Sequence, residues 1–76
     1  MPNLPPVTLN GYPVIEYDVH ANCATIMVER CDNAIKYVVA TWWPSLGTSW
    51  SWGHYCATIG EARAAFTDAN KRNRNR

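Results

Sequence analysis

Two short stretches of the sequence, His20-x-x-Cys23 and His54-x-Cys56, carry histidine and cysteine at spacings that could do chemistry. Imidazole and thiolate are ligands that zinc prefers, and a histidine beside a cysteine is also the pair used in thiol catalysis. A structural zinc site usually has two ligand pairs in compact spacing, and Cys31 extends neither pair. On a strand, side chains two residues apart also lack a third group that would orient the base. We therefore expect no metal, no cofactor and no enzymatic activity.

Length and composition restrict the function further. A chain of 76 residues buries only roughly 60% of its unfolded surface, which leaves room for one domain and no deep pocket. Hydrophobic residues make up 47% and charged residues 17%, as in globular proteins. No apolar run approaches the ~20 residues that span a bilayer, and the first residues do not resemble a signal peptide. Three cysteines are a poor disulfide framework. We expect a cytoplasmic protein without membrane contact.

Hydrophobic periodicity predicts four strands followed by a helix. Residues 14–20 and 23–30 alternate between apolar and polar side chains, which predicts a hairpin. Residues 34–43 are rich in β-branched and aromatic side chains and form the expected central strand, and residues 50–55 form the fourth. The predicted fold is α+β: a small antiparallel four-stranded sheet (ββββα) with one C-terminal helix packed on one face and the other face open.

The start of the helix is the clearest local signal. Thr58-Ile59-Gly60-Glu61 is a capping box, in which the Thr58 hydroxyl accepts from the third helical amide and Glu61 reaches back to the Thr58 amide. Apolar side chains then recur at helical spacing on one face. This stripe consists of Ile59, Ala62, Phe66 and Ala69.

Proline and charge mark the two ends of the expected domain. Prolines and the turn residues Asn10-Gly11 predict an extended N-terminal arm over residues 1–13, before a single α+β domain over residues 14–70. Residues 71–76, KRNRNR, are expected to be a basic tail that offsets the negative end of the helix dipole. Deleting residues 73–76 is then expected to leave folding nearly unchanged.

All four tryptophans lie within residues 42–52. Alternation along a strand places Trp50, Trp52 and His54 on one face and Tyr55 on the other. The same alternation separates Trp42 from Trp43. Because the helix stripe is mostly alanine, we expect one of these two indoles to fill the core beneath the helix. The other is expected to join an exposed aromatic patch of the kind that marks an interaction site.

The exposed aromatic residues favour binding to another protein, because tryptophan, tyrosine and arginine dominate interface hot spots. The leading hypothesis is a small inhibitor or adaptor. Its expected partner-binding residues are Trp43, Trp50, Trp52, Tyr55, His54, Glu16 and Asp18. A second copy of the chain could also cover the open sheet face, as in a symmetric homodimer.

The alternative is a module that binds single-stranded nucleic acid. Bases would stack on the aromatic sheet face while the cations of the tail follow phosphates. Those cations are Lys71, Arg72, Arg74 and Arg76. Outside the tail, three cationic residues face six carboxylates, and an acidic sheet repels a polyanion, so protein binding is favoured.

The run YVVATWWPSLGTSWSWGHYC followed by EARAAF, over residues 37–66, resembles the β-hairpin and alanine-rich helix of short proteins from phages and other mobile elements. Within that group the chain is similar to the anti-CRISPR proteins, which are short, single-domain and often α+β. The resemblance implies evasion of host defence in the bacterial cytoplasm, with a subunit or complex of a CRISPR effector as partner. The chain lacks the strong acidity of members that imitate DNA, so the resemblance implies that it blocks a surface or a channel sterically.

Overall fold

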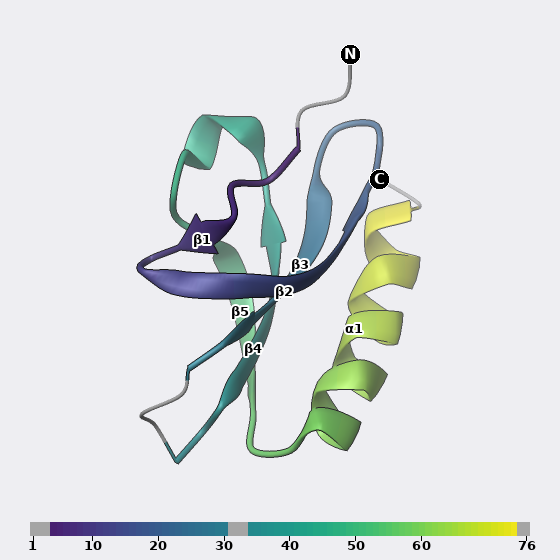
Figure 1. The fold of residues 1–76 in the computed structure, drawn as a ribbon. Coiled ribbons are helices and arrows are strands. Elements are labelled where there is room, and N and C mark those ends of the chain that lie inside the picture. The colour runs from purple at the N-terminus through teal and green to yellow at the C-terminus, as the bar shows by residue number, and fades with distance from the viewer. Residues whose placement is uncertain (1–3, 31–33, 75–76) are drawn as a thin grey trace.

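The structure, a computed structural model, describes residues 4–30 and 34–74. Its elements are β1 (Thr8–Leu9), β2 (Tyr12–Val19), β3 (Ala24–Glu29), β4 (Tyr37–Trp42), the short 3-10 helix η1 (Pro44–Leu46), β5 (Ser51–Cys56) and α1 (Ile59–Arg74). The strands form one antiparallel sheet in the order β1-β2-β3-β4-β5, and α1 lies along one side of it (Figure 1). The α+β class and the C-terminal helix are confirmed. The sheet has five strands where four were expected.

The additional strand, β1, comes from the segment expected to be an extended arm. Asn10 and Gly11 both have positive φ, 51° and 85°, which suits the tight two-residue turn of a hairpin. The turn places Leu9 opposite Tyr12, and the Leu9 side chain is fully buried. The Asn10 amide also donates to the carbonyl of Thr48 at 2.7 Å, which ties the hairpin to the loop before β5. Residues 8 and 9 are therefore part of the sheet.

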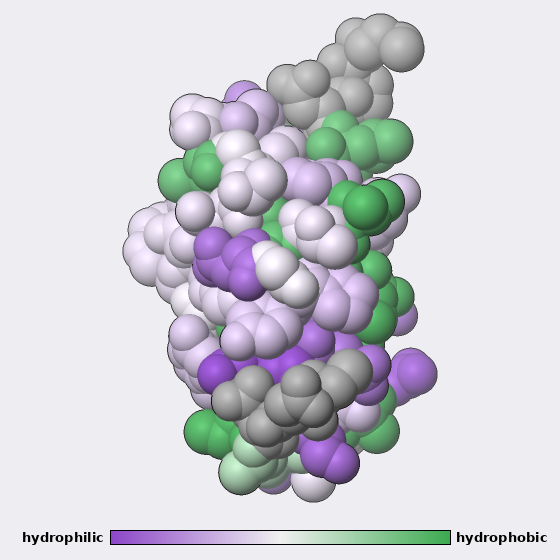
Figure 2. Space-filling view, turned by 60° about the vertical axis from the view of Figure 1, so that its left-hand side comes forward, coloured by the Kyte–Doolittle hydropathy of each residue, from purple (hydrophilic) through white to green (hydrophobic). Residues whose placement is uncertain are grey.

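The sheet face turned away from α1 is buried, so the expectation of an open face is wrong. Half-buried side chains of β2, η1 and the loop before β5 pack against a buried cluster there, among them Tyr12, Leu46 and Trp50. We refer to the buried cluster itself as the inner cluster. It consists of Leu9, Ala24, Ile26, Val28, Val38, Ala40 and Trp42. On the side away from α1, hydrophobic residues appear on the surface only as separate patches between hydrophilic ones (Figure 2).

The opposite sheet face forms a second cluster with α1. Met27 and Val39 from the sheet meet Ala62 and Ala69 from the helix, and Phe66 packs at the margin. The predicted helix stripe is thus confirmed at its last three positions, while its first residue is exposed.

No tryptophan of β4 fills the core beneath the helix, contrary to expectation. Along β4 the side chains of Val39 and Thr41 face α1, whereas those of Val38, Ala40 and Trp42 face away from it. Trp42 is therefore buried in the inner cluster, where its indole Nε1 donates to the carbonyl of Gly47 at 2.8 Å.

Both ends of α1 are defined by hydrogen bonds. At its start the Glu61 amide donates to the Thr58 hydroxyl at 3.2 Å, which confirms the threonine half of the predicted capping box. At its end the helix continues to Arg74, so it includes four of the six residues expected to form a tail. Asn73 is only 2% exposed and bonds to the sheet. Arg76 lies outside the described residues.

Candidate functional site

A β-bulge in β5 determines where its aromatic side chains point. Val39 pairs with His54 and Thr41 pairs with Ser51, so Trp52 and Gly53 together stand opposite the single residue Ala40. Trp52 has a φ of 55°, in the left-handed region that bulky residues rarely adopt. An extra residue in one strand reverses the faces on either side of it. Trp52 therefore turns toward α1, while Trp50 packs against the inner cluster. The expectation that these two tryptophans share one face is wrong.

Two of the four tryptophans form a pair at the surface. The rings of Trp43 and Trp52 meet edge to face, with centroids 5.0 Å apart and planes at 84°. Trp52 is 62% exposed and Trp43 is half-buried. Because Trp42 is only 5% exposed, the predicted separation of Trp42 from Trp43 is confirmed. Trp50 is half-buried, and its ring centre lies 6.4 Å from that of Tyr12.

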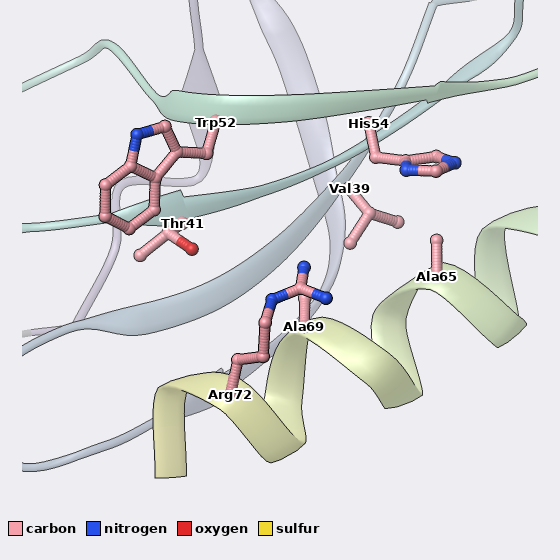
Figure 3. Close-up of a pocket in the computed structure, with 7 residues that line it drawn as sticks. All are labelled: Val39, Thr41, Trp52, His54, Ala65, Ala69 and Arg72. Carbon is pink, nitrogen blue, oxygen red and sulfur yellow. The ribbon is translucent and has the colours of Figure 1, made fainter. Parts of the chain in front are cut away.

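Trp52 borders a pocket of about 260 Å³ between the sheet and the helix. Figure 3 shows residues of β4 and β5 on one side of this space and residues of α1 on the other. Arg72 extends from the last turn of the helix toward the strands (Figure 3). We refer to the space as the β5–α1 pocket, lined by Val39, Thr41, Trp52, His54, Ala65, Ala69 and Arg72.

The electrostatics of the β5–α1 pocket are one-sided. None of its lining residues is acidic, and Arg72 brings a permanent positive charge. Within the part of the chain that the structure describes, Arg72 forms neither an ion pair nor a hydrogen bond with another residue. The hydroxyl of Thr41 is engaged, since it donates to Asn73 Oδ1 at 3.3 Å. The pocket thus combines an available guanidinium with an indole and aliphatic surface.

The remaining residues expected to bind a partner lie elsewhere. Tyr55 is half exposed on the other face of β5, opposite Val38. Its ring faces the guanidinium of Arg30, whose carbon lies 5.3 Å from the ring centre. Glu16 and Asp18 belong to β2, which β3 and β4 separate from β5. The structure therefore groups Trp43, Trp52 and His54 with Arg72, and leaves the other expected residues outside this group.

Sequence reasoning missed a polar network that joins α1 to the sheet. His20 Nε2 lies 2.6 Å from Asn70 Oδ1, and the Asn70 amide donates to Asp18 Oδ2 at 2.7 Å. One turn later, the Asn73 amide donates to the hydroxyl of Thr25 at 2.9 Å. The sequence spacing did indicate that residue 73 faces the sheet, because it continues the helix stripe of residues 62, 66 and 69 at helical intervals. Asp18, an exposed residue of β2, thus accepts a hydrogen bond from the helix.

In each histidine–cysteine pair, the hydrogen bond that joins the two residues involves a backbone carbonyl. Cys56 is buried under α1, and its thiol donates to the backbone carbonyl of His54 at 3.7 Å rather than to the imidazole. Burial, and secondarily the negative charge of Glu61, raise the pKa of the Cys56 thiol, which disfavours the thiolate that catalysis needs. In the other pair, the His20 amide donates to the carbonyl of Cys23 and closes a hairpin turn. Residues 4–30 and 34–74 contain no group of three side chains placed to hold a metal ion.

In the same described residues, no helix is both long and apolar enough to cross a bilayer.

Comparison with protein-family models, with curated proteins and with solved structures found no match to this chain.

Proposed function

We propose that this chain is a small protein-binding module, an inhibitor or adaptor, that binds its partner through Trp52 and the β5–α1 pocket. The observation that carries the proposal is the backbone of Trp52, which has a positive φ although the residue after it is glycine. Such a conformation costs a non-glycine residue on the order of 1–3 kcal/mol. The indole that it presents is mostly exposed, so burial of the ring does not offset that cost. Strain of this kind is typical of binding sites.

The neighbours of Trp52 support the same role. The ring of Trp43 contacts the ring of Trp52 edge to face. Arg72, on α1, lies on the opposite side of the pocket from the strand that carries Trp52. Tryptophan and arginine are the residue types most enriched in interface hot spots. A module of this kind acts by occupying a surface of its partner, so it needs no catalytic group.

Binding of single-stranded nucleic acid is the second candidate, supported by the presence of Trp52 and Arg72 in one pocket. Base stacking beside a cation is one way in which proteins hold single strands. Two features disfavour it. The sheet face that would have stacked several bases is covered by the β1–β2 hairpin, and Lys71 and Arg74 do not line the pocket. Protein binding therefore remains the proposed function.

The resemblance to anti-CRISPR proteins supplies the class of partner to test first, a subunit of a CRISPR effector complex in the bacterial cytoplasm. An inhibitor of that class would mask a surface or a channel in proportion to its own concentration. A second copy of the chain is the other candidate partner, and sedimentation of the purified protein distinguishes a homodimer from a monomer.

Affinity capture from bacterial lysate followed by reconstitution tests the proposal. The wild type, Trp52→Gly and Tyr17→Ala are compared, because Tyr17 is an exposed aromatic residue on β2, away from the pocket. We expect a stoichiometric protein partner with the wild type and Tyr17→Ala. In calorimetry with the purified partner, Trp52→Gly should bind ~30-fold more weakly, as for a hot-spot residue. Recovery of nucleic acid alone, or equal binding by Trp52→Gly, would overturn the proposal.

A further inference from the structure

The charge of the β5–α1 pocket restricts what it can accept. Arg72 brings a guanidinium to a space that no carboxylate lines, and this guanidinium has no hydrogen-bonding partner within the described residues. A guanidinium presents parallel N–H donors in a fixed plane, which match the two oxygens of a carboxylate. The complement of this end of the pocket is a single negative charge with planar geometry.

Beside the polar side chains of Thr41 and His54, the rest of the lining offers apolar side chains that favour an apolar group on the same ligand. Val39 from the sheet side and Ala65 and Ala69 from the helix side supply aliphatic surface, and the indole of Trp52 lies beside them (Figure 3). An aspartate or glutamate side chain carries only one or two methylene groups and would leave most of this surface wet. At a C-terminal residue with a large apolar side chain, the carboxylate and the apolar group are attached to the same Cα.

A phosphodiester strand matches the pocket less well. A nucleic acid carries one negative charge per nucleotide, and proteins that bind it neutralise several phosphates together. The β5–α1 pocket has one arginine, which stands in the last turn of α1, where the helix dipole is negative. A single carboxylate requires only the one guanidinium.

We infer that the β5–α1 pocket binds the C-terminal residue of a partner polypeptide, with its carboxylate on Arg72 and its apolar side chain between Trp52 and the aliphatic surface. The inference rests on the proposed function and specifies the chemistry of its partner. It makes Arg72 a determinant of specificity and Trp52 the main apolar contact.

Small probes test this assignment without a known partner. The ¹⁵N-labelled full chain is titrated with N-acetyl-phenylalanine and with N-acetyl-phenylalaninamide, which differ only in the charge of the terminal group. NMR shifts of the Trp52 indole N–H and of the Arg72 amide report binding. We expect a Kd on the order of 1 mM for the acid, as for a ligand of this size, and ~5-fold weaker binding of the amide. Arg72→Gln should remove the difference, and Arg74→Gln, in the same turn but outside the lining, should preserve it.

Two further probes separate other sources of negative charge. N-acetyl-glutamic acid α-amide carries its carboxylate on the side chain, and a short oligothymidylate carries phosphodiesters. The assignment is overturned if either of them binds more tightly than N-acetyl-phenylalanine, or if acid and amide bind equally to the wild type. Should the probes fail while Trp52→Gly still loses the captured partner, only the C-terminal assignment is wrong. Should the probes behave as expected while Trp52→Gly retains that partner, the proposed function is wrong instead.

Discussion

The side-chain amide of Asn73 donates a hydrogen bond to the hydroxyl of Thr25, with 2.9 Å between Nδ2 and Oγ1, and so joins the last turn of α1 to β3. The same amide lies 3.1 Å from the hydroxyl of Thr41 on β4. All three side chains are buried, where an unsatisfied polar group is costly. The end of the helix is therefore part of the folded domain rather than a solvated extension.

Asn73→Ala should destabilise the protein. The substitution leaves two buried threonine hydroxyls without this partner, and the cost is roughly 1–3 kcal/mol in the free energy of unfolding. Urea denaturation followed by circular dichroism measures it. Arg74→Ala, at an exposed neighbouring position, is the control and should change stability little. Equal urea midpoints for Asn73→Ala and wild type would refute this role of Asn73. For the same reason, deleting residues 73–76 should destabilise the fold, contrary to the expectation from sequence.

Trp42→Ala should be the most damaging of the four tryptophan substitutions. It removes a large buried side chain from the inner cluster and the hydrogen bond to Gly47, at a cost of roughly 3–5 kcal/mol. Thermal melts of the four alanine variants give the order. We expect an intermediate loss for the half-buried Trp50 and a smaller one for the exposed Trp52. A loss for Trp52→Ala as large as that for Trp42→Ala would contradict this assignment.

Trp52→Gly should be more stable than Trp52→Ala. Both variants lose the contact with Trp43. Position 52 has a φ of 55°, and only glycine accepts this conformation without steric cost. The difference in the free energy of unfolding should be about 1 kcal/mol in favour of glycine. Parallel urea titrations of the two variants measure it. If alanine proves equally stable, the backbone at position 52 is unstrained.

Alanine substitutions of two glycines should have opposite effects. A Cβ at Gly53 would lie 3.0 Å from Trp50 Nε1 and 3.3 Å from a methyl carbon of Val38. This crowding should make Gly53→Ala cost about 1–2 kcal/mol. A Cβ at Gly60 meets nothing closer than 4.0 Å. Because alanine is the better helix former, Gly60→Ala should gain about 0.5 kcal/mol. Thermal melts of both variants check the signs, and a stabilising Gly53→Ala would contradict the packing described at β5.

Alkaline pH should weaken the fold partly through Cys56. Burial and Glu61 raise the pKa of this thiol, so the folded state holds the proton more tightly than the unfolded chain does. Its contribution to stability is complete below the unfolded pKa and is lost as the pH rises through the folded pKa. Above about pH 9, the free energy of unfolding of the wild type should therefore fall more steeply than that of Cys56→Ala. Urea denaturation at a series of pH values above 9 measures the free energy of unfolding of both proteins. Cys56→Ala accounts for the other titrating groups, and equal pH dependence of the two free energies would exclude the effect.

Periodicity predicted where most elements lie, although the pairing of β2 shifts between Val14 and Glu16 and β3 is buried on both faces. The β2–β3 hairpin, the strand β4 and the start of α1 after Thr58 follow from the pattern of apolar residues and the capping threonine. β1 was missed because the many prolines around it indicated an irregular arm, although Asn10-Gly11 is a strong hairpin turn. Asn73 was missed because asparagine is rarely buried, and the two threonines opposite it favour its burial by hydrogen bonding.

The residues of the site could be predicted by type but not by arrangement. Trp43, Trp52 and His54 were expected to bind a partner, and they do lie near one another. A residue with positive φ in a bulge is usually a glycine. Here Trp52 has the positive φ and glycine occupies the next position, so the sequence did not indicate the bulge. Without the bulge, the alternation in β5 assigns Trp52 to the wrong face. Arg72 was assigned to a tail because nothing local shows that the helix continues through it.

The bulge in β5 also bears on how this chain behaves at high concentration. In the described part of the chain, β4 is the sole strand neighbour of β5, so the far side of β5 is an edge at which another chain could add a strand. A bulge disrupts the regular spacing of donors and acceptors that such addition requires, and the bulky ring of Trp52 stands beside it. We therefore expect the same irregularity that orients the indole to hinder fibrous aggregation through this strand edge.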